Sequence, residues 1–203
     1  MTGSPVALVV EDEADLASLY SAWLREACTV RTAYDGAQAL DAIDEGIDIV
    51  LLDRRMPGLS GDEVLETIRD RGLDTRVAMV TAVEPDFDIV GMGFDDYLVK
   101  PVSQRDLMET VDQLLLRSTY DEQMQDYFAL ASKKAVLDAR KPEAELRASE
   151  EYARLEDRLA VLRTEIDDTV SELSDGDGYR RICRDIADRR APNATDAELS
   201  EFE

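Results

Sequence analysis

The sequence places side chains that could act on a phosphoryl group directly after four short apolar segments. Glu11 and Asp12 follow the first segment in the chain, Asp53 the third, Thr81 the fourth and Lys100 the fifth. If the segments are neighbouring strands of one sheet, three carboxylates, one hydroxyl and one ammonium group meet at its edge. Such a set can bind a divalent cation and the oxygens of a phosphoryl group.

The three carboxylates indicate a magnesium site. Carboxylates a few ångströms apart cannot all stay ionised without a nearby cation. The chain contains no histidine, and a small set of hard oxygen ligands suits Mg²⁺, which keeps several of its waters. We expect Glu11, Asp12 and Asp53 to bind the metal, with the backbone carbonyl of Arg55 completing the protein ligands.

Asp53 is the expected nucleophile because it lies between the acidic pair and the two groups that would hold phosphoryl oxygens. Those two groups are the hydroxyl of Thr81 and the ammonium of Lys100. Taken singly, the acids could be helix caps, Thr81 a turn residue and Lys100 a surface charge. Such residues follow four strands that are neighbours in the expected sheet. This coincidence favours the interpretation that they act together as one functional site.

The elements that must position these residues alternate along the first half of the chain. Apolar runs predict strands at 5–10, 29–33, 48–52, 76–80 and 97–99. Helical spacing predicts helices at 14–27, 36–45, 61–71, 85–92 and 103–117. The alternation indicates a parallel α/β sheet covered on both faces, whose ligands bind beyond the carboxyl ends of the strands.

Four motifs in this half resemble response-regulator receiver domains. They are Val-Val-Glu-Asp-Glu, Leu-Leu-Asp-Arg-Arg-Met-Pro-Gly-Leu-Ser-Gly, Val-Thr-Ala and Asp-Tyr-Leu-Val-Lys-Pro, at 9–13, 51–61, 80–82 and 96–101. The resemblance covers residues 5 to about 117. It implies a flavodoxin-like (βα)5 fold with strand order 2-1-3-4-5, and phosphotransfer from a sensor histidine kinase to Asp53.

The resemblance also assigns roles residue by residue. It makes Glu11 and Asp12 the metal-binding pair, Asp53 the acceptor, Thr81 the switch hydroxyl, Tyr97 the switch aromatic and Lys100 the phosphate-binding lysine. It also makes Lys100–Pro101 a candidate cis peptide bond. The pair is Glu-Asp where the family more often has Asp-Asp, so we expect altered metal geometry.

The second half of the chain predicts helices without catalytic groups. A helix is expected at 119–140, with an apolar face, and another at 143–173 after the break at Lys141-Pro142. The second carries a heptad stripe of Tyr152, Leu155, Leu159, Leu162, Ile166, Thr169 and Leu173. A helical hairpin is favoured over a parallel coiled-coil dimer, because three heptads are short for an independent coiled coil.

Residues 118–185 resemble the HalX domain, which follows receiver domains largely in halophilic archaea and has no agreed catalytic residues. The composition agrees: 46 acidic residues against 23 basic ones give a net charge of −23, with only four lysines. Molar salt screens such self-repulsion. We expect a receiver domain at 1–118, a helical domain at 119–190 and a flexible acidic tail at 191–203.

The expected function is therefore that of a two-component response regulator with a helical output or dimerisation domain. The alternative is a DNA-binding transcriptional regulator, supported only by arginines in a predicted helix at 179–190, which alternate with acids. An aspartyl-phosphate phosphatase is not expected, because the position two residues after Asp53 holds Arg55, which cannot serve as a general acid.

The composition predicts the location, whereas the receiver resemblance and the apolar helical faces predict the partners. No apolar run reaches the roughly 18–20 residues needed to cross a bilayer, and residues 1–5 show no secretory signal. We therefore expect a cytoplasmic protein without membrane contact, whose partners are a histidine kinase and either a second copy or another protein.

Overall fold

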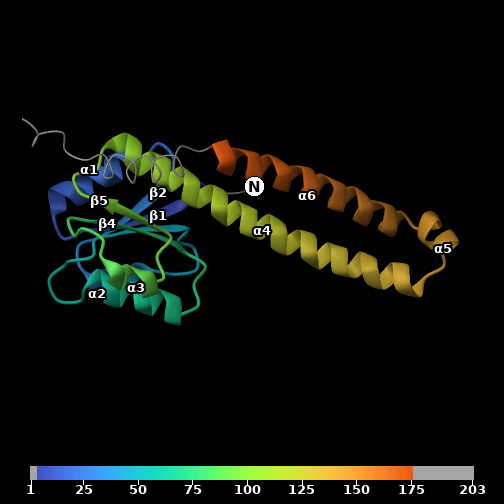
Figure 1. The fold of residues 1–203 in the computed structure, drawn as a ribbon, viewed down its shortest axis with the longest axis horizontal. Helices are drawn as coiled ribbons and strands as arrows, with labels where there is room; N and C mark the ends of the chain where they lie inside the picture. Colours follow the sequence, from blue (N-terminus) through green and yellow to red (C-terminus); the bar gives the residue numbers. More distant parts are fainter. Residues whose placement is uncertain (1–3, 176–203) are drawn as a thin grey trace, which may run out of the picture.

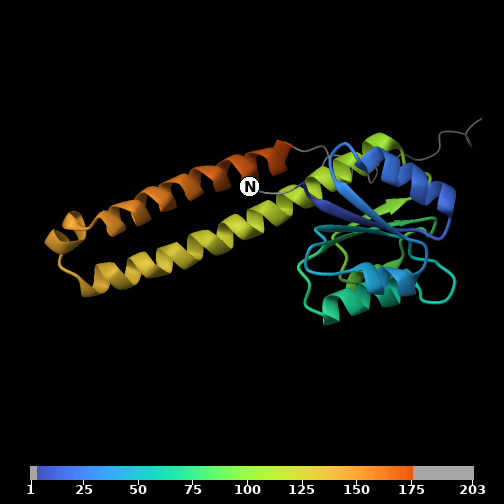
Figure 2. The same cartoon turned by 180° about the vertical axis from the view of Figure 1, so that it is seen from behind.

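The computed structural model describes residues 4–175, which form an α/β domain and a helical hairpin that projects from it (Figure 1). Figure 2 shows the same arrangement from behind, with the hairpin extending away from the sheet. The predicted helix at 179–190 and the predicted tail at 191–203 lie outside the described residues. In residues 4–175, no helix combines the length and apolarity that a membrane span requires.

Five parallel strands form one sheet in the order β2-β1-β3-β4-β5, which confirms the predicted topology. They are β1 (Val6–Val10), β2 (Thr29–Ala33), β3 (Ile49–Leu52), β4 (Arg76–Thr81) and β5 (Asp96–Val99). The register pairs Val10 with Leu52, so β1 and β3 end side by side. Thr81 pairs with Val99, so β4 and β5 also end together.

Helices cover both faces of the sheet because successive strand residues point to opposite sides. On one face lie α2 (Gly36–Ala42) and α3 (Gly61–Asp70), and on the other lie α1 (Ala14–Leu24) and the first part of α4 (Gln104–Arg140) (Figure 1). The buried apolar residues divide accordingly into two clusters. The three central strands are almost fully buried, which fixes the position of their carboxyl ends.

The predicted helix at 85–92 is instead a short 3₁₀ helix, η1 (Phe87–Gly91). The sequence prediction was wrong here because the apolar residues of this segment do not form a buried face: η1 contains no buried residue. Only Met92 and Phe94, which follow it, pack against the core.

The two helices predicted at 103–117 and 119–140 are one continuous helix, α4. Its sequence contains neither glycine nor proline, so nothing interrupts the backbone hydrogen bonds where the burial pattern changes. The helix begins after Ser103, whose hydroxyl accepts a hydrogen bond from the Asp106 N–H at 3.2 Å. It ends at Lys141, which adopts an extended conformation before Pro142. The predicted boundary at 118 falls inside this helix.

The C-terminal part of α4 pairs with α6 (Glu150–Asp175) in an antiparallel hairpin, after the short helix α5 (Glu143–Ala148) (Figures 1 and 2). The predicted single helix at 143–173 is thus divided at Ser149, whose hydroxyl accepts a hydrogen bond from the Tyr152 N–H. Far from the turn, the Thr169 hydroxyl donates to Gln123 Oε1 at 3.0 Å. Close to the turn, the Tyr152 hydroxyl donates to Asp138.

The heptad stripe of α6 faces its own α4, which supports the hairpin that the sequence favoured. Leu162 is only 1% exposed, although it lies on a two-helix arm, whereas its neighbour Val161 is 47% exposed. The substitution Leu162→Ala should therefore destabilise the hairpin by about 2–5 kcal/mol. Val161→Ala should change its stability by no more than about 0.5 kcal/mol.

Hydrogen exchange of the 150–175 amides measures both effects, with the sheet amides as an internal reference. Equal losses of protection in the two variants would contradict a buried seam between α4 and α6.

Candidate metal and phosphoryl site

The structure brings the three predicted carboxylates together at the carboxyl ends of β1 and β3. Glu11, Asp12 and Asp53 each offer an oxygen atom within 4.8 Å of the others. Glu11 and Asp53 are buried, whereas Asp12 is exposed. Among the described residues, no other group of three or more potential metal ligands has this proximity.

Lys100 enters this cluster from the end of β5. Its Nζ lies 2.6 Å from Asp53 Oδ2 and 2.7 Å from Glu11 Oε2. Burial lowers the pKa of Lys100, but the hydrogen bonds and charges of the two carboxylates outweigh it and raise the pKa above the ordinary value. Burial raises the pKa of Glu11, against the opposing effect of Lys100. One ammonium thus balances part of a dense negative charge.

The donor set fits a magnesium ion. It consists of carboxylate oxygens alone, and the exposed Asp12 gives the cluster a side open to solvent, as suits an ion that retains several waters. The Arg55 backbone carbonyl as a further ligand stays a prediction. The Arg55 N–H, for its part, donates to Asp53 Oδ1 at 3.1 Å.

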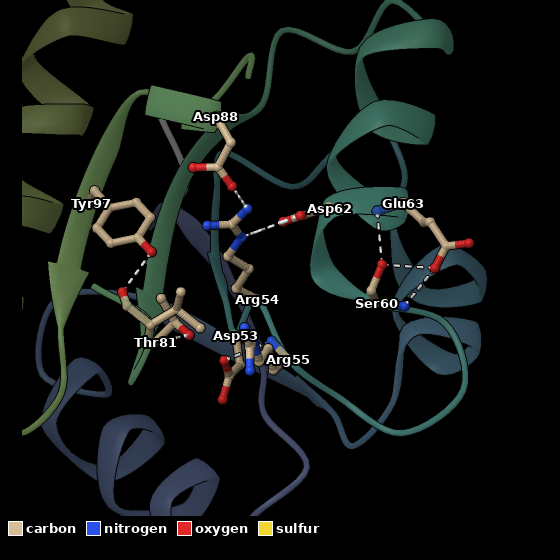
Figure 3. Close-up of polar contacts among 10 residues, drawn as sticks. Asp53, Arg54, Arg55, Ser60, Asp62, Glu63, Thr81, Asp88 and Tyr97 are labelled. Carbon is tan, nitrogen blue, oxygen red and sulfur yellow. Dashed lines mark hydrogen bonds and ion pairs between the residues drawn. The ribbon is translucent and has the colours of Figure 1, made fainter. Parts of the chain in front are cut away.

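The loop after Asp53 is fixed by a close backbone approach. The Gly61 N–H donates to the Arg54 carbonyl at 2.9 Å. A Cβ atom at Gly61 would lie 2.1 Å from the Asp53 carbonyl oxygen, so only glycine fits there. The following helix, α3, begins with a capping box between Ser60 and Glu63 (Figure 3).

Thr81 and Tyr97, the predicted switch residues, are linked through the backbone of Val83. Thr81 is buried at the end of β4, and its Oγ1 accepts a hydrogen bond from the Val83 N–H at 3.3 Å. The half-buried Tyr97 donates its hydroxyl hydrogen to the Val83 carbonyl at 2.7 Å (Figure 3). Its ring packs against Phe94, with 5.4 Å between centroids. The Lys100–Pro101 peptide bond is cis.

Arg54 is a residue of the site that sequence reasoning missed. Its side chain runs from the acceptor loop away from Asp53, toward Asp62 at the start of α3 and Asp88 in η1 (Figure 3). Nε lies 3.0 Å from Asp62 Oδ1, and Nη2 pairs with Asp88. Hydrogen bonds to Asp88 and Asp62 raise the pKa of Arg54. Its only sequence signal was an arginine directly after a buried strand.

Comparison with known families agrees with this geometry. The profile of the response regulator receiver domain matches residues 7–112. The chain belongs to the response regulator receiver family. A second profile, that of the HalX domain, matches residues 116–183, directly after the receiver domain.

Three curated relatives match between 57% and 79% of this chain. A Haloferax volcanii protein that carries the name of a transcriptional regulator is 55% identical over 161 residues, which are 79% of this chain and 28% of that protein. Escherichia coli CpxR, a transcriptional regulatory protein, is 40% identical over 59% of this chain and 53% of CpxR. Mycobacterium bovis RegX3, a sensory transduction protein, is 41% identical over 57% and 52%. The chain thus spans about half or less of these relatives.

Solved structures show the same fold in the receiver domain. The signal receiver domain of a LuxO-type repressor protein from Vibrio parahaemolyticus has a TM-score of 0.55 and 26% identity, and the match covers 59% of this chain and 96% of that one. The beryllofluoride-activated receiver domain of DrrB has a TM-score of 0.52 and 26% identity, with 56% and 98% coverage.

Removing the exposed acid of the cluster tests the metal site of the receiver domain. Asp12→Asn should weaken Mg²⁺ binding by about tenfold or more, because affinity depends on the number of charged oxygen ligands. Isothermal titration calorimetry in molar KCl measures this. Asp15→Asn, which removes an equal charge from the exposed first turn of α1, is the matched control. An equal loss in both variants would indicate a general charge effect and not a ligand at Asp12.

Proposed function

We propose that this protein is a cytoplasmic response regulator that accepts a phosphoryl group on Asp53 in a Mg²⁺-dependent reaction and passes the signal to its helical hairpin. The observation that carries the proposal is the carboxylate of Asp53, which lies at the sheet edge beside two further acids and Lys100, whose ammonium contacts both Asp53 and Glu11. This is the arrangement that an aspartyl nucleophile facing a phosphoryl group requires.

The transfer forms one bond and breaks one. An Asp53 oxygen attacks phosphorus, and the bond between phosphorus and a histidine nitrogen of the donor kinase breaks. The electron pair stays on that nitrogen, and the kinase imidazole leaves as a neutral group when its other ring nitrogen carries a proton. A bound magnesium ion would neutralise charge that develops on the phosphoryl oxygens. Lys100, already within 2.6 Å of Asp53, would hold one of these oxygens, and the Thr81 hydroxyl another.

The same residues supply a conformational response. If Thr81 turns toward a phosphoryl oxygen, its hydrogen bond from the Val83 N–H is released. Tyr97 bonds the carbonyl of that same residue, so a displacement of Val83 frees the tyrosine hydroxyl as well. The change would appear on the surface formed by η1, β5 and the start of α4.

A single helix, α4, connects the neighbourhood of Lys100 to the hairpin. α4 begins at Gln104, four residues after Lys100, and continues without interruption into the hairpin. Two contacts fix it near the opposite end of the sheet: Arg76 pairs with both Asp95 and Asp121, and Arg117 donates to the Asp95 carbonyl at 3.2 Å. A shift at either end of β5 would thus be transmitted to the hairpin as a rigid displacement.

Catalysis on other substrates is not part of this function. Arg55 occupies the position two residues after the nucleophile, where it cannot protonate a leaving group or activate water. The chain would therefore only accept a phosphoryl group and lose it slowly by hydrolysis. The relatives CpxR and RegX3, named as transcriptional regulatory and sensory transduction proteins, support a role in signalling.

A second candidate is a phosphorylation-controlled transcriptional regulator that binds DNA. The names of the Haloferax protein and of CpxR favour it. The similarity to CpxR covers only about half of that protein, however, and the arginines that could contact DNA lie at 180–190, outside the described residues. A gel-shift assay with and without a phosphoryl donor separates the candidates, since an interaction module shifts no DNA in either case.

Asp53→Asn tests the acceptor directly. With Mg²⁺ and a small phosphoryl donor such as acetyl phosphate, the wild-type chain should gain one phosphoryl group, and the variant should gain none, because the nucleophilic carboxylate is gone. Intact-mass spectrometry measures this. The exposed acid Asp41 provides the control, since Asp41→Asn should be labelled like wild type. Labelling that persists in Asp53→Asn would place the acceptor elsewhere.

The output can be tested by light scattering after size exclusion in high salt. Mg²⁺ and beryllofluoride together should change the mass or the elution volume of the wild-type chain, as expected for a hairpin that dimerises or moves, and should leave Asp53→Asn unchanged. A wild-type chain with identical mass and elution volume in both conditions would argue against an output through a second copy of the chain.

A further inference from the structure

In the connection between β4 and β5, Met92 and Phe94 pack against the core, but the segment before them lacks such apolar packing. Its 3₁₀ helix, η1, contains no buried residue, and Phe87 and Val90 are 91% and 83% exposed. The internal hydrogen bonds of η1, such as Ile89 N–H to the Asp86 carbonyl, stay within the segment itself. They shape η1 but do not fix where it lies. Its position must therefore depend on polar contacts with the rest of the domain.

Arg54 provides such a contact. It follows Asp53 directly, and its side chain is only 11% exposed although it carries a charge. The guanidinium forks between Asp62, at the start of α3, and Asp88, in η1 (Figure 3). A planar guanidinium can hold two carboxylates at once, which a lysine ammonium at the end of a flexible chain does less specifically. Arg54 thus joins the acceptor loop, α3 and η1.

The ion pair that Arg54 forms with Asp62 and Asp88 lies between two cavities. A cavity of about 640 Å³ lies on the side of Val83 and Glu84, and another of about 500 Å³ lies between α3 and Met92. Arg54, Asp62 and Asp88 line both cavities. The ion pair therefore forms the wall between two hollows, whose remaining lining includes apolar side chains such as Met56 and Leu65.

A motion of η1 away from the acceptor loop must open this ion pair. Val83, which is bonded to both Thr81 and Tyr97, lies five residues before Asp88 in the same connection. If Val83 moves together with Thr81, η1 must move as well, because both belong to the same connection. The ion pair between Asp88 of η1 and Arg54 of the acceptor loop resists this movement. The tether starts one residue away from Asp53, so the acceptor and the connection that would respond to it are mechanically joined.

We propose that Arg54 is a positioning residue that holds the β4–β5 connection on the acceptor loop, so that the connection can follow Thr81 only when the Arg54–Asp88 ion pair opens. The proposal rests on Asp53 being the phosphoacceptor. In this proposal the Arg54–Asp88 ion pair opposes the conformational change. Its strength determines how large a fraction of Asp53 must carry a phosphoryl group before Tyr97 moves. Arg54 is little exposed but Asp88 is 51% exposed, so salt screens the pair in part.

The test is a titration of the full chain with beryllofluoride at saturating Mg²⁺, followed by the amide NMR signals of Thr81, Val83 and Tyr97. Asp88→Asn removes the tether but leaves every proposed ligand in place. It should lower the beryllofluoride concentration at half-conversion by about twofold to fivefold, the range expected for opening one partly exposed ion pair. Asp88→Glu, which keeps the charge, should restore a wild-type value.

Asp70→Asn is the matched control, since it removes one charge from an exposed position at the end of α3 and should leave the half-conversion point unchanged. Thermal unfolding of each variant separates a loss of stability from a shifted switch. An unchanged or higher half-conversion point in Asp88→Asn would overturn the proposal, as would an equal shift in Asp70→Asn or in Asp88→Glu.

A failure of the proposed function would look different. In that case beryllofluoride would move none of the three signals in the wild-type chain, or would move them equally in Asp53→Asn.

Discussion

Negative charge gathers at the carboxyl ends of β1 and β3, and the ammonium group of Lys100 balances part of it. Its contacts of 2.6 and 2.7 Å with Asp53 and Glu11 let two buried acids lie side by side. Lys100 can reach them because β4 and β5 extend the sheet on the side of β3. The contact therefore depends on the order of the strands in the sheet. The remaining charge makes the cluster attractive to a cation.

The same contact lies at the head of the longest element of the protein. β5 carries Tyr97 on its length and Lys100 at its end, and α4 starts directly afterward. At the other end of β5, Asp95 binds Arg69, Arg76 and the Val77 N–H. The strand is therefore held at both ends by charge and is joined to a helix that has no internal break. The buried residues Leu107, Val111 and Leu114 hold α4 on the sheet. The Arg76–Asp121 ion pair and the hydrogen bond from Arg117 to the Asp95 carbonyl add polar contacts between α4 and this end of the sheet.

The sequence predicted the sheet and the cluster because both depend on local patterns. Buried central strands read as uninterrupted apolar runs, and polar residues directly after them fall at one sheet edge by geometry alone. Prediction failed where local patterns carry no information. In α4, the change from a receiver face to a hairpin face resembled a boundary, although no glycine or proline interrupts the helix there. In η1, Phe87 and Val90 had helical spacing but no surface to pack on. Arg54 was overlooked because its two partners, Asp62 and Asp88, are distant in sequence and join it only in the fold.

The acidic composition adds a constraint on which of these contacts can matter in concentrated salt. With a net charge of −23, the chain repels itself in dilute solution, and salt relieves this by screening over roughly 3 Å at 1 M. The same screening weakens exposed pairs, such as Arg147–Glu143 and Arg154–Glu150 on the hairpin. The Lys100 contacts are largely shielded from solvent and are screened least. Arg54 is also little exposed, although its partners Asp62 and Asp88 are 43% and 51% exposed. The charge–charge contacts that persist best in concentrated salt are therefore in the receiver domain, next to Asp53. The hairpin depends instead on the apolar seam around Leu162.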